Sequence, residues 1–139
     1  MRLYPRRLKR ALESDKVEAI GDKHAVPTYT LDIAEHLRPF LADNPAGGIL
    51  HLCNDGGCTW REYGEYALQC AAEAGVPVKT QCVGFIPMSD MKAFVAKRPV
   101  YTVMATDRLA SLTGTKPRSW QTAVDDFVRN HFAGSLSPR

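Results

Sequence analysis

The stretch Gly48-Ile49-Leu50-His51-Leu52-Cys53-Asn54-Asp55-Gly56-Gly57-Cys58-Thr59-Trp60-Arg61-Glu62 contains the strongest structural signals in the sequence. Its first six residues are an apolar run bounded by glycine, which is typical of a strand covered on both faces, as in a parallel sheet. The residues Asn54-Asp55-Gly56-Gly57 predict a tight turn. Thr59 and Glu62 stand at the capping-box spacing, at which each side chain bonds the other residue's backbone N–H. A helix is therefore predicted to begin at Trp60.

This helix is predicted to be long and amphipathic, and to run from Trp60 to Ala74. Polar and charged residues separate its apolar positions, and Gly75 supplies a C-terminal stop. The apolar positions are Trp60, Tyr63, Ala67, Cys70, Ala71 and Ala74. A strand, a turn and a capped helix in this order indicate an α/β domain.

Three elements are predicted before Gly48. A helix is expected over Arg6–Ser14 and a short strand over Val17–Ile20. A second helix is expected to begin at a Thr28 or Thr30 cap, and Pro39 is expected to kink or end it because proline removes a backbone donor. The predicted apolar stripe of this helix consists of Ile33, Ala34, Leu37 and Leu41.

The C-terminal half is predicted to contain a third strand and two further helices. Alternating apolar and polar residues predict a strand over Val76–Val83, followed by an irregular segment over Pro87–Pro99 and an extended one over Tyr101–Ala105. Thr106 is expected to cap a brief helix, and Ser119 a longer one. The apolar face of the last helix consists of Trp120, Ala123, Val124, Phe127, Val128 and His131. The alternation of strands and helices favours at least one parallel strand pair.

The composition is that of a soluble globular domain. We expect one domain over residues 1–132 and a disordered tail, rich in Gly, Ser and Pro, over residues 133–139. No apolar run approaches the roughly eighteen residues that a membrane helix needs, and no apolar stretch follows the basic N-terminus. We therefore predict a cytoplasmic protein that does not act at a membrane.

Basic residues are concentrated at the N-terminus, where five of the first ten residues are Arg or Lys. Such a cluster is found in nucleic-acid and phosphate sites, but also on solvated helix faces. Segments that bind single strands usually interleave aromatic residues with the basic ones, and only Tyr4 is available here. The solvated face is the favoured interpretation, and no nucleic-acid partner is expected.

The four cysteines are expected to fill the core. Cys53, Cys58, Cys70 and Cys82 include no Cys-x-x-Cys pair, and no histidine stands at a zinc-finger interval from them. We therefore predict no metal site.

Four segments of the sequence resemble parts of a known family. They are Pro27-Thr28-Tyr29-Thr30-Leu31-Asp32-Ile33-Ala34, Gly48 through Trp60, Ala96-Lys97-Arg98-Pro99 through Thr106-Asp107-Arg108-Leu109, and Lys116-Pro117-Arg118-Ser119-Trp120. In this order and at about these spacings, they resemble the C-terminal, substrate-binding part of dTDP-4-dehydrorhamnose reductases, which are extended short-chain dehydrogenases/reductases. The resemblance covers roughly Leu8 to Phe132.

The resemblance implies an α/β fold: the small substrate-binding lobe of an NAD(P)-binding Rossmann-type reductase, with a short, partly parallel sheet and packed helices. In this family a Rossmann half holds NADPH or NADH with a Gly-x-x-Gly-x-x-Gly series, and a Tyr-x-x-x-Lys pair supplies the proton. This sequence contains neither motif. We therefore expect the Rossmann half to be missing, and the chain alone to hold no cofactor, to contain no catalytic residue and to be inactive.

The resemblance also implies that the lobe closes over a dTDP-linked 4-keto nucleotide sugar, a substrate of deoxysugar and dTDP-rhamnose biosynthesis. Arg98, beside Lys97 and before Pro99, stands where related enzymes place an arginine that contacts the diphosphate. A guanidinium suits a diphosphate because its planar fork donates two parallel hydrogen bonds. The alternative is a surface arginine on a loop.

Four more residues are candidates for the substrate site. The resemblance implies that Pro27, Thr28 and Tyr29 lie at the lobe junction near the sugar. Asn54 lies in a glycine-rich turn whose backbone could approach a phosphate. The simpler interpretation is that Pro27 ends an extended segment, Thr28 caps a helix, and Asn54 belongs to a turn.

Two classes of function remain open at this stage. The first is the substrate-binding lobe of a nucleotide-sugar reductase. A lobe without its Rossmann half has an orphaned face, which predicts either a homo-oligomer or a missing partner segment. The alternative is a non-catalytic regulatory protein, because the β-subunit of methionine adenosyltransferase resembles these reductases and yet serves a partner enzyme.

Overall fold

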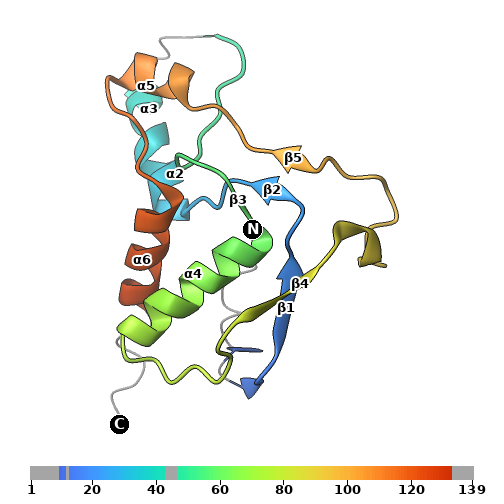
Figure 1. The fold of residues 1–139 in the computed structure, drawn as a ribbon. Helices are drawn as coiled ribbons and strands as arrows, with labels where there is room; N and C mark the ends of the chain where they lie inside the picture. The colour runs from blue at the N-terminus through green and yellow to red at the C-terminus, as the bar shows by residue number, and fades with distance from the viewer. Residues whose placement is uncertain (1–9, 12, 43–46, 133–139) are drawn as a thin grey trace.

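The computed structural model describes residues 10–11, 13–42 and 47–132, and these form a mixed α/β fold (Figure 1). Its strands are β1 (Val17–Ile20), β2 (His24–Ala25), β3 (Cys58–Thr59), β4 (Val83–Ile86) and β5 (Tyr101–Thr102). Its helices are α2 (Thr30–Leu37), α3 (Pro39–Ala42), α4 (Trp60–Glu73), the 3-10 helix η1 (Met88–Asp90), α5 (Asp107–Thr113) and α6 (Trp120–His131). The predicted tail over 133–139 lies outside the described residues. So does most of the helix predicted over Arg6–Ser14, of which residues 10, 11 and 13 are helical.

Strands β1 and β4 form a parallel pair. The register runs from Val17 opposite Val83 to Ile20 opposite Ile86. Helix α4 lies between these two strands in the sequence and packs against both of them (Figure 1). The expectation of an α/β fold with a short, partly parallel sheet and packed helices is confirmed.

Strands β3, β2 and β5 form a second, smaller sheet in that order. The central strand β2 runs antiparallel to β3 and parallel to β5. Since β3 leads directly into α4, this sheet joins the start of α4 to the segment that enters α2 and to the segment that ends in β5 (Figure 1). The extended segment predicted over Tyr101–Ala105 is present as the shorter strand β5.

Helix α4 begins with the predicted capping box. The Thr59 N–H donates to Glu62 Oε2 (2.7 Å), and the Glu62 N–H donates to the Thr59 hydroxyl (3.1 Å). The first bond holds the pKa of Glu62 below its ordinary value. The Glu62 carboxylate therefore stabilises the fold at pH values above the pKa that it has in the unfolded chain. This stabilisation is lost as the pH falls through the lower pKa that it has in the folded chain. The helix ends before Gly75, whose φ of +77° is left-handed.

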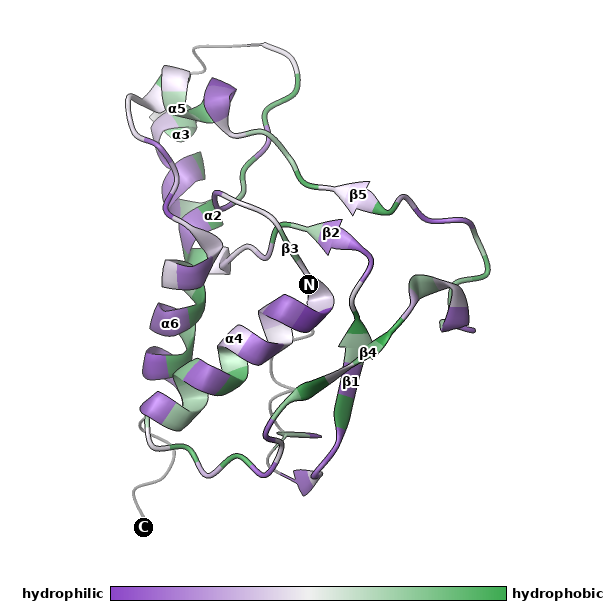
Figure 2. Ribbon diagram, viewed as in Figure 1, coloured by the Kyte–Doolittle hydropathy of each residue, from purple (hydrophilic) through white to green (hydrophobic). Residues whose placement is uncertain are grey.

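The main core lies between α4 and α6. Both helices show hydrophobic residues alternating with hydrophilic ones in Figure 2, as expected of helices with one buried face. The predicted Ser119 cap of α6 is confirmed, because its hydroxyl accepts from the Thr122 N–H (3.2 Å). The buried members of this core are Cys58, Tyr63, Ala67, Cys70, Ala71, Val76, Trp120, Val124 and Val128.

The predicted strand over the apolar run Gly48–Cys53 is wrong. These residues form no strand, and Ile49 is 78% exposed. The guanidinium of Arg108 donates to the carbonyl oxygens of Gly47 (2.7 Å) and Ile49 (2.9 Å). The segment is therefore held by a side chain of α5 and does not join a sheet; only Cys53, at its end, is buried with the core.

The strand predicted over Val76–Val83 begins only at its last residue. The backbone donors of the preceding segment are used elsewhere: the Val76 N–H bonds Ala71 O, and the Lys79 and Thr80 N–H groups bond Ala11 O. The segment therefore packs across the end of α4 and the helical turn at Ala11. Only from Val83 onward are the backbone groups free to pair with β1.

The predicted effect of Pro39 is confirmed, because α2 ends at Leu37 and α3 begins at Pro39. The predicted apolar stripe is wrong, because Ala34, Leu37 and Leu41 are exposed and the buried residue of α2 is Asp32. A charged residue sets the orientation of this helix, and the next subsection identifies its partner.

The predicted caps of two helices are also corrected. The residue that caps α2 is Tyr29, with no side-chain cap bond, so neither Thr28 nor Thr30 has this role. Thr106 stands at the cap position of α5, but its hydroxyl donates to Asp55 Oδ1 (3.3 Å) instead of accepting from the helix.

Thr59, which caps α4, and Thr30, the first residue of α2, allow a direct test of the capping assignment. Thr59→Ala removes the hydroxyl that accepts from Glu62, and we expect the free energy of unfolding to fall by about 1 kcal/mol. Thr30→Ala is the matched control, and we expect a change within about 0.5 kcal/mol. Urea unfolding of both variants measures the difference; equal losses would contradict the assignment.

Candidate functional site

Asn54 lies at the centre of a buried polar cluster, and its side chain is fully buried. Its Oδ1 accepts from the Tyr29 N–H (2.9 Å), while its Nδ2 donates to Asp32 Oδ2 (2.5 Å) and, more weakly, to Arg118 O (3.4 Å). The amide therefore joins the start of α2, the segment before β3 and the segment before α6. We call Asp32, Asn54 and Arg118 the polar hub.

The charges of the polar hub are compensated. Asp32 is 3% exposed, and the guanidinium of Arg118 donates to both of its carboxylate oxygens (2.8 to 3.1 Å). Arg118 also pairs with Asp126 on α6. The Asp32 carboxylate, with help from Asp126, holds the pKa of Arg118 above its ordinary value. A buried carboxylate is tolerated because this two-pronged pairing replaces its water contacts.

The hub fixes the predicted site residues Pro27, Thr28 and Tyr29 between β2 and α2. Pro27 is buried, and Thr28 and Tyr29 are half-buried. The Tyr29 hydroxyl shares a hydrogen bond with His131 Nε2 (3.1 Å), and its ring meets that of Phe127 edge-on. Tyr29 is thus held at its backbone by Asn54 and at its side chain by α6. The Asn54 side chain itself is fully buried and uses both its oxygen and its nitrogen on groups of the protein.

Lys97 and Arg98 lie on an exposed segment that joins β4 to β5. We call residues 88–99 the Arg98 arm. The guanidinium carbon of Arg98 lies 4.8 Å from the centre of the Phe94 ring, and that ring packs edge-on against Trp60 (6.2 Å). Among the described residues, no carboxylate pairs with Arg98. This cation–π contact holds the guanidinium near the ring, and no carboxylate in the described part of the chain occupies its N–H groups.

The two groups of predicted site residues are not brought together at one point. Strands β2 and β5 run parallel, with His24 opposite Tyr101 and Ala25 opposite Thr102. Arg98 precedes β5, whereas Pro27 follows β2, so the two residues lie toward opposite ends of this parallel strand pair. A ligand that touches both groups must be extended and must lie along the β2–β5 pair.

Sequence reasoning missed the residues that hold this arrangement. Arg118 lies in a segment that was singled out by resemblance, but its bond to Asp32 joins residues 86 positions apart. Lys23 is buried and donates to Pro99 O (2.7 Å), next to Arg98. No local pattern signals either contact, because Asp32 lies on the side of the predicted helix opposite its apolar stripe, where a solvated charge is the ordinary expectation.

The cysteines behave as core residues with one exception. Cys53, Cys58 and Cys70 are buried, as predicted, whereas Cys82 is exposed. Burial raises the pKa of the Cys58 thiol to about 12 and also raises those of Cys53 and Cys70. The described residues contain no group of three or more His, Cys, Asp or Glu side chains that could hold a metal ion. None of the described helices is long and apolar enough to cross a bilayer.

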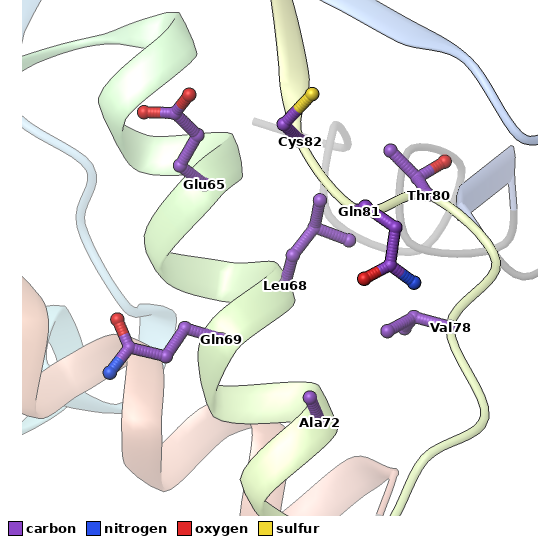
Figure 3. Close-up of a pocket in the computed structure, with 8 residues that line it drawn as sticks. All are labelled: Glu65, Leu68, Gln69, Ala72, Val78, Thr80, Gln81 and Cys82. Atoms are coloured by element: carbon purple, nitrogen blue, oxygen red, sulfur yellow. The ribbon is translucent and has the colours of Figure 1, made fainter.

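A groove of about 290 Å³ lies between α4 and the segment that precedes β4 (Figure 3). It is separate from the predicted site, because its lining includes neither the polar hub nor the Arg98 arm. Its lining residues are Glu65, Leu68, Gln69, Ala72, Val78, Thr80, Gln81 and Cys82.

The polar hub predicts a large difference between two arginines. Arg118→Ala leaves the Asp32 charge buried without its partner, and we expect the free energy of unfolding to fall by about 3 kcal/mol or more. Arg129→Ala removes an exposed pair with Asp125 on α6, and a loss of about 0.5 kcal/mol is expected. Urea unfolding measures both; a small effect of Arg118→Ala would show that the hub does not organise the fold.

Comparison with known proteins places this geometry in a family. The RmlD substrate binding domain family matches residues 4–132. The spore coat polysaccharide biosynthesis protein SpsK of Bacillus subtilis is 27% identical over 88% of this chain and 40% of its own length. A dTDP-4-dehydrorhamnose reductase of Streptomyces griseus is 31% identical over 82% of this chain and 37% of its own length.

Solved structures show the same fold. The dTDP-4-dehydrorhamnose reductase of Bacillus anthracis, in complex with NADP, superposes with a TM-score of 0.77 at 19% identity over 91% of this chain and 41% of that one. An orthologue from Clostridium acetobutylicum gives 0.75 at 18% identity, over 88% and 41%. The chain thus spans about two fifths of the length of these relatives. It belongs to the RmlD substrate binding domain family.

Proposed function

We propose that this chain is the nucleotide-sugar-binding lobe of a cytoplasmic reductase that acts on a dTDP-linked 4-keto sugar. The observation that carries the proposal is the arginine at the position expected from the family: Arg98 is exposed, stacked on Phe94 and, within the described residues, free of any carboxylate. Family membership supports the class of ligand, because relatives of this chain include dTDP-4-dehydrorhamnose reductases.

Arg98 has the chemistry that a diphosphate requires. The diphosphate of a nucleotide sugar carries two negative charges, and a guanidinium donates two parallel, charge-assisted hydrogen bonds to such a group. Lys97, adjacent and exposed, adds a second cation. Because the contact with the Phe94 ring already restricts the Arg98 side chain, less conformational freedom is lost when the anion binds.

The segment Pro27–Tyr29 is proposed to face the sugar end of the ligand. It lies beyond the far end of the β2–β5 pair from Arg98, and the hub holds it at Tyr29. A dTDP-sugar is an extended molecule, so the separation of the two groups is consistent with one ligand that contacts both. Thr28 is the half-buried hydroxyl of this segment.

The residues of this chain do not fit a nicotinamide cofactor or proton transfer to a 4-keto group. The sequence has no Gly-x-x-Gly-x-x-Gly series to receive a pyrophosphate and no Tyr-x-x-x-Lys pair. We therefore propose that the lobe binds and orients the sugar nucleotide, and that hydride and proton transfer require a Rossmann unit in the same or a second polypeptide.

The role of Arg98 is tested by titration with dTDP, followed by NMR chemical shifts. We expect a dissociation constant of about a millimolar, because the lobe offers only part of a site. Arg98→Ala should raise this constant about tenfold or more, and Arg98→Lys should raise it less, because the charge remains and the fork is lost. Arg129→Ala, an exposed arginine on α6, should leave it unchanged. Equal effects of Arg98→Ala and Arg129→Ala would refute the assignment.

The division of labour is tested with the 139-residue chain and an intact reductase as positive control. We expect the chain to show no saturable quenching or enhancement of NADPH fluorescence and no turnover of a dTDP-4-keto sugar, because the phosphate-binding glycines and the proton donor are absent from its sequence. Turnover near the rate of the intact reductase would overturn this part of the proposal.

A further inference from the structure

The turn between β1 and β2 touches both ends of the Arg98 arm. The Met88 N–H, at the start of the arm, donates to Asp22 Oδ1 (2.8 Å). Lys23 Nζ donates to Pro99 O (2.7 Å), at the end of the arm. Two adjacent residues thus hold the first and last residues of the segment that presents Lys97 and Arg98.

The contact of Lys23 is buried and extends into the second sheet. Lys23 is 7% exposed, and its ammonium also lies 3.5 Å from Thr102 Oγ1, whose hydroxyl donates to His24 O (2.9 Å). The His24 N–H donates to Val100 O (2.8 Å). In the described part of the chain no carboxylate pairs with Lys23. A buried ammonium is costly unless its donors are used, and here they are used on the chain that directly follows Arg98.

The interior of the arm has few other attachments. Beyond the short helix η1, the Phe94 N–H donates to Met91 O (2.9 Å), and the Phe94 ring lies between Trp60 and Arg98. Val95 is almost fully exposed. Both ends of the arm are bonded to neighbouring residues, and fixing the ends of a loop reduces the number of conformations that it can adopt.

We propose that Asp22 and Lys23 are positioning residues for anion binding by the Arg98 arm. This inference rests on the proposed function of Arg98 as a diphosphate ligand and adds what holds that ligand in place. Neither residue needs to touch the diphosphate. By fixing both ends of the arm before binding, they lower the conformational entropy that is lost when the anion is bound.

The direction in which Asp22→Ala changes anion affinity distinguishes this proposal from a simple effect of charge. Removing a negative charge near an anion site strengthens anion binding when charge alone matters. We call the bonds of Asp22 to Met88 and of Lys23 to Pro99 the clamp. If the clamp positions the arm, Asp22→Ala weakens anion binding, because the acceptor of the Met88 N–H is lost. Asp22→Asn removes the same charge but keeps an acceptor oxygen. Asp90→Ala, in η1, removes a charge within the arm itself and leaves both clamp bonds intact.

The test compares Asp22→Ala, Asp22→Asn, Asp90→Ala and Lys23→Met in the 139-residue chain. The two measurements are ¹⁵N relaxation of the arm amides and titration with dTDP. We expect Asp22→Ala to increase the fast motion of the arm amides and to raise the dissociation constant for dTDP about threefold or more. Asp22→Asn should keep both near the wild-type values, and so should Asp90→Ala, with affinity unchanged or slightly higher. Lys23→Met should loosen the arm from its other end, provided that urea unfolding shows a folded chain.

The two measurements separate failure of this inference from failure of the proposed function. Unchanged arm relaxation in Asp22→Ala, together with an affinity equal to that of Asp22→Asn, overturns the clamp. A mobile arm in Asp22→Ala, combined with an unchanged dTDP affinity in Arg98→Ala, supports the clamp and rejects Arg98 as the diphosphate ligand.

Discussion

The pairing of Asp32 with Arg118 is the interaction on which the rest of this structure depends. A carboxylate that is 3% exposed is tolerated only with a partner that uses its oxygens, and the guanidinium of Arg118 donates to both of them. Asn54 then links the pair to the backbone of Tyr29. Through these three residues, α2, the segment before β3 and the start of α6 become one body.

The polar hub also explains why the surface of α2 is unusual. An amphipathic helix normally turns its apolar side to the core, yet α2 buries Asp32 and leaves Leu31 and Leu37 exposed. This rotation of the helix places the Asp32 carboxylate where the buried Asn54 amide and the Arg118 guanidinium donate to it, and both donors would lose this acceptor if the helix turned its leucines inward. That rotation brings Tyr29 against α6 and sets the position of the segment before it.

The surface proposed to bind the sugar nucleotide is assembled from parts that are held by different kinds of interaction. The polar hub anchors the Tyr29 end, and the contact with Phe94 holds Arg98 at the other. The β2–β5 pair lies between them, and the β1–β2 turn holds the arm at both ends. Such an arrangement is consistent with the proposed binding of an extended, charged molecule, since each end of that ligand would meet groups that are already ordered.

The sequence by itself determined the starts of α4 and α6 and the break at Pro39. These features are local, because a cap or a proline acts on backbone groups within one helical turn. The resemblance predicted the fold, and it also singled out Arg98 as a candidate ligand for a diphosphate. Tertiary structure decided the rest. The apolar run Gly48–Cys53 predicted a buried strand, but a run is buried only where another element covers it, and this one is held by Arg108 instead. Likewise, Asp32 meets Arg118 across 86 positions, a contact that only the folded chain creates, because hydrophobic periodicity contains no information about the partner of a buried charge.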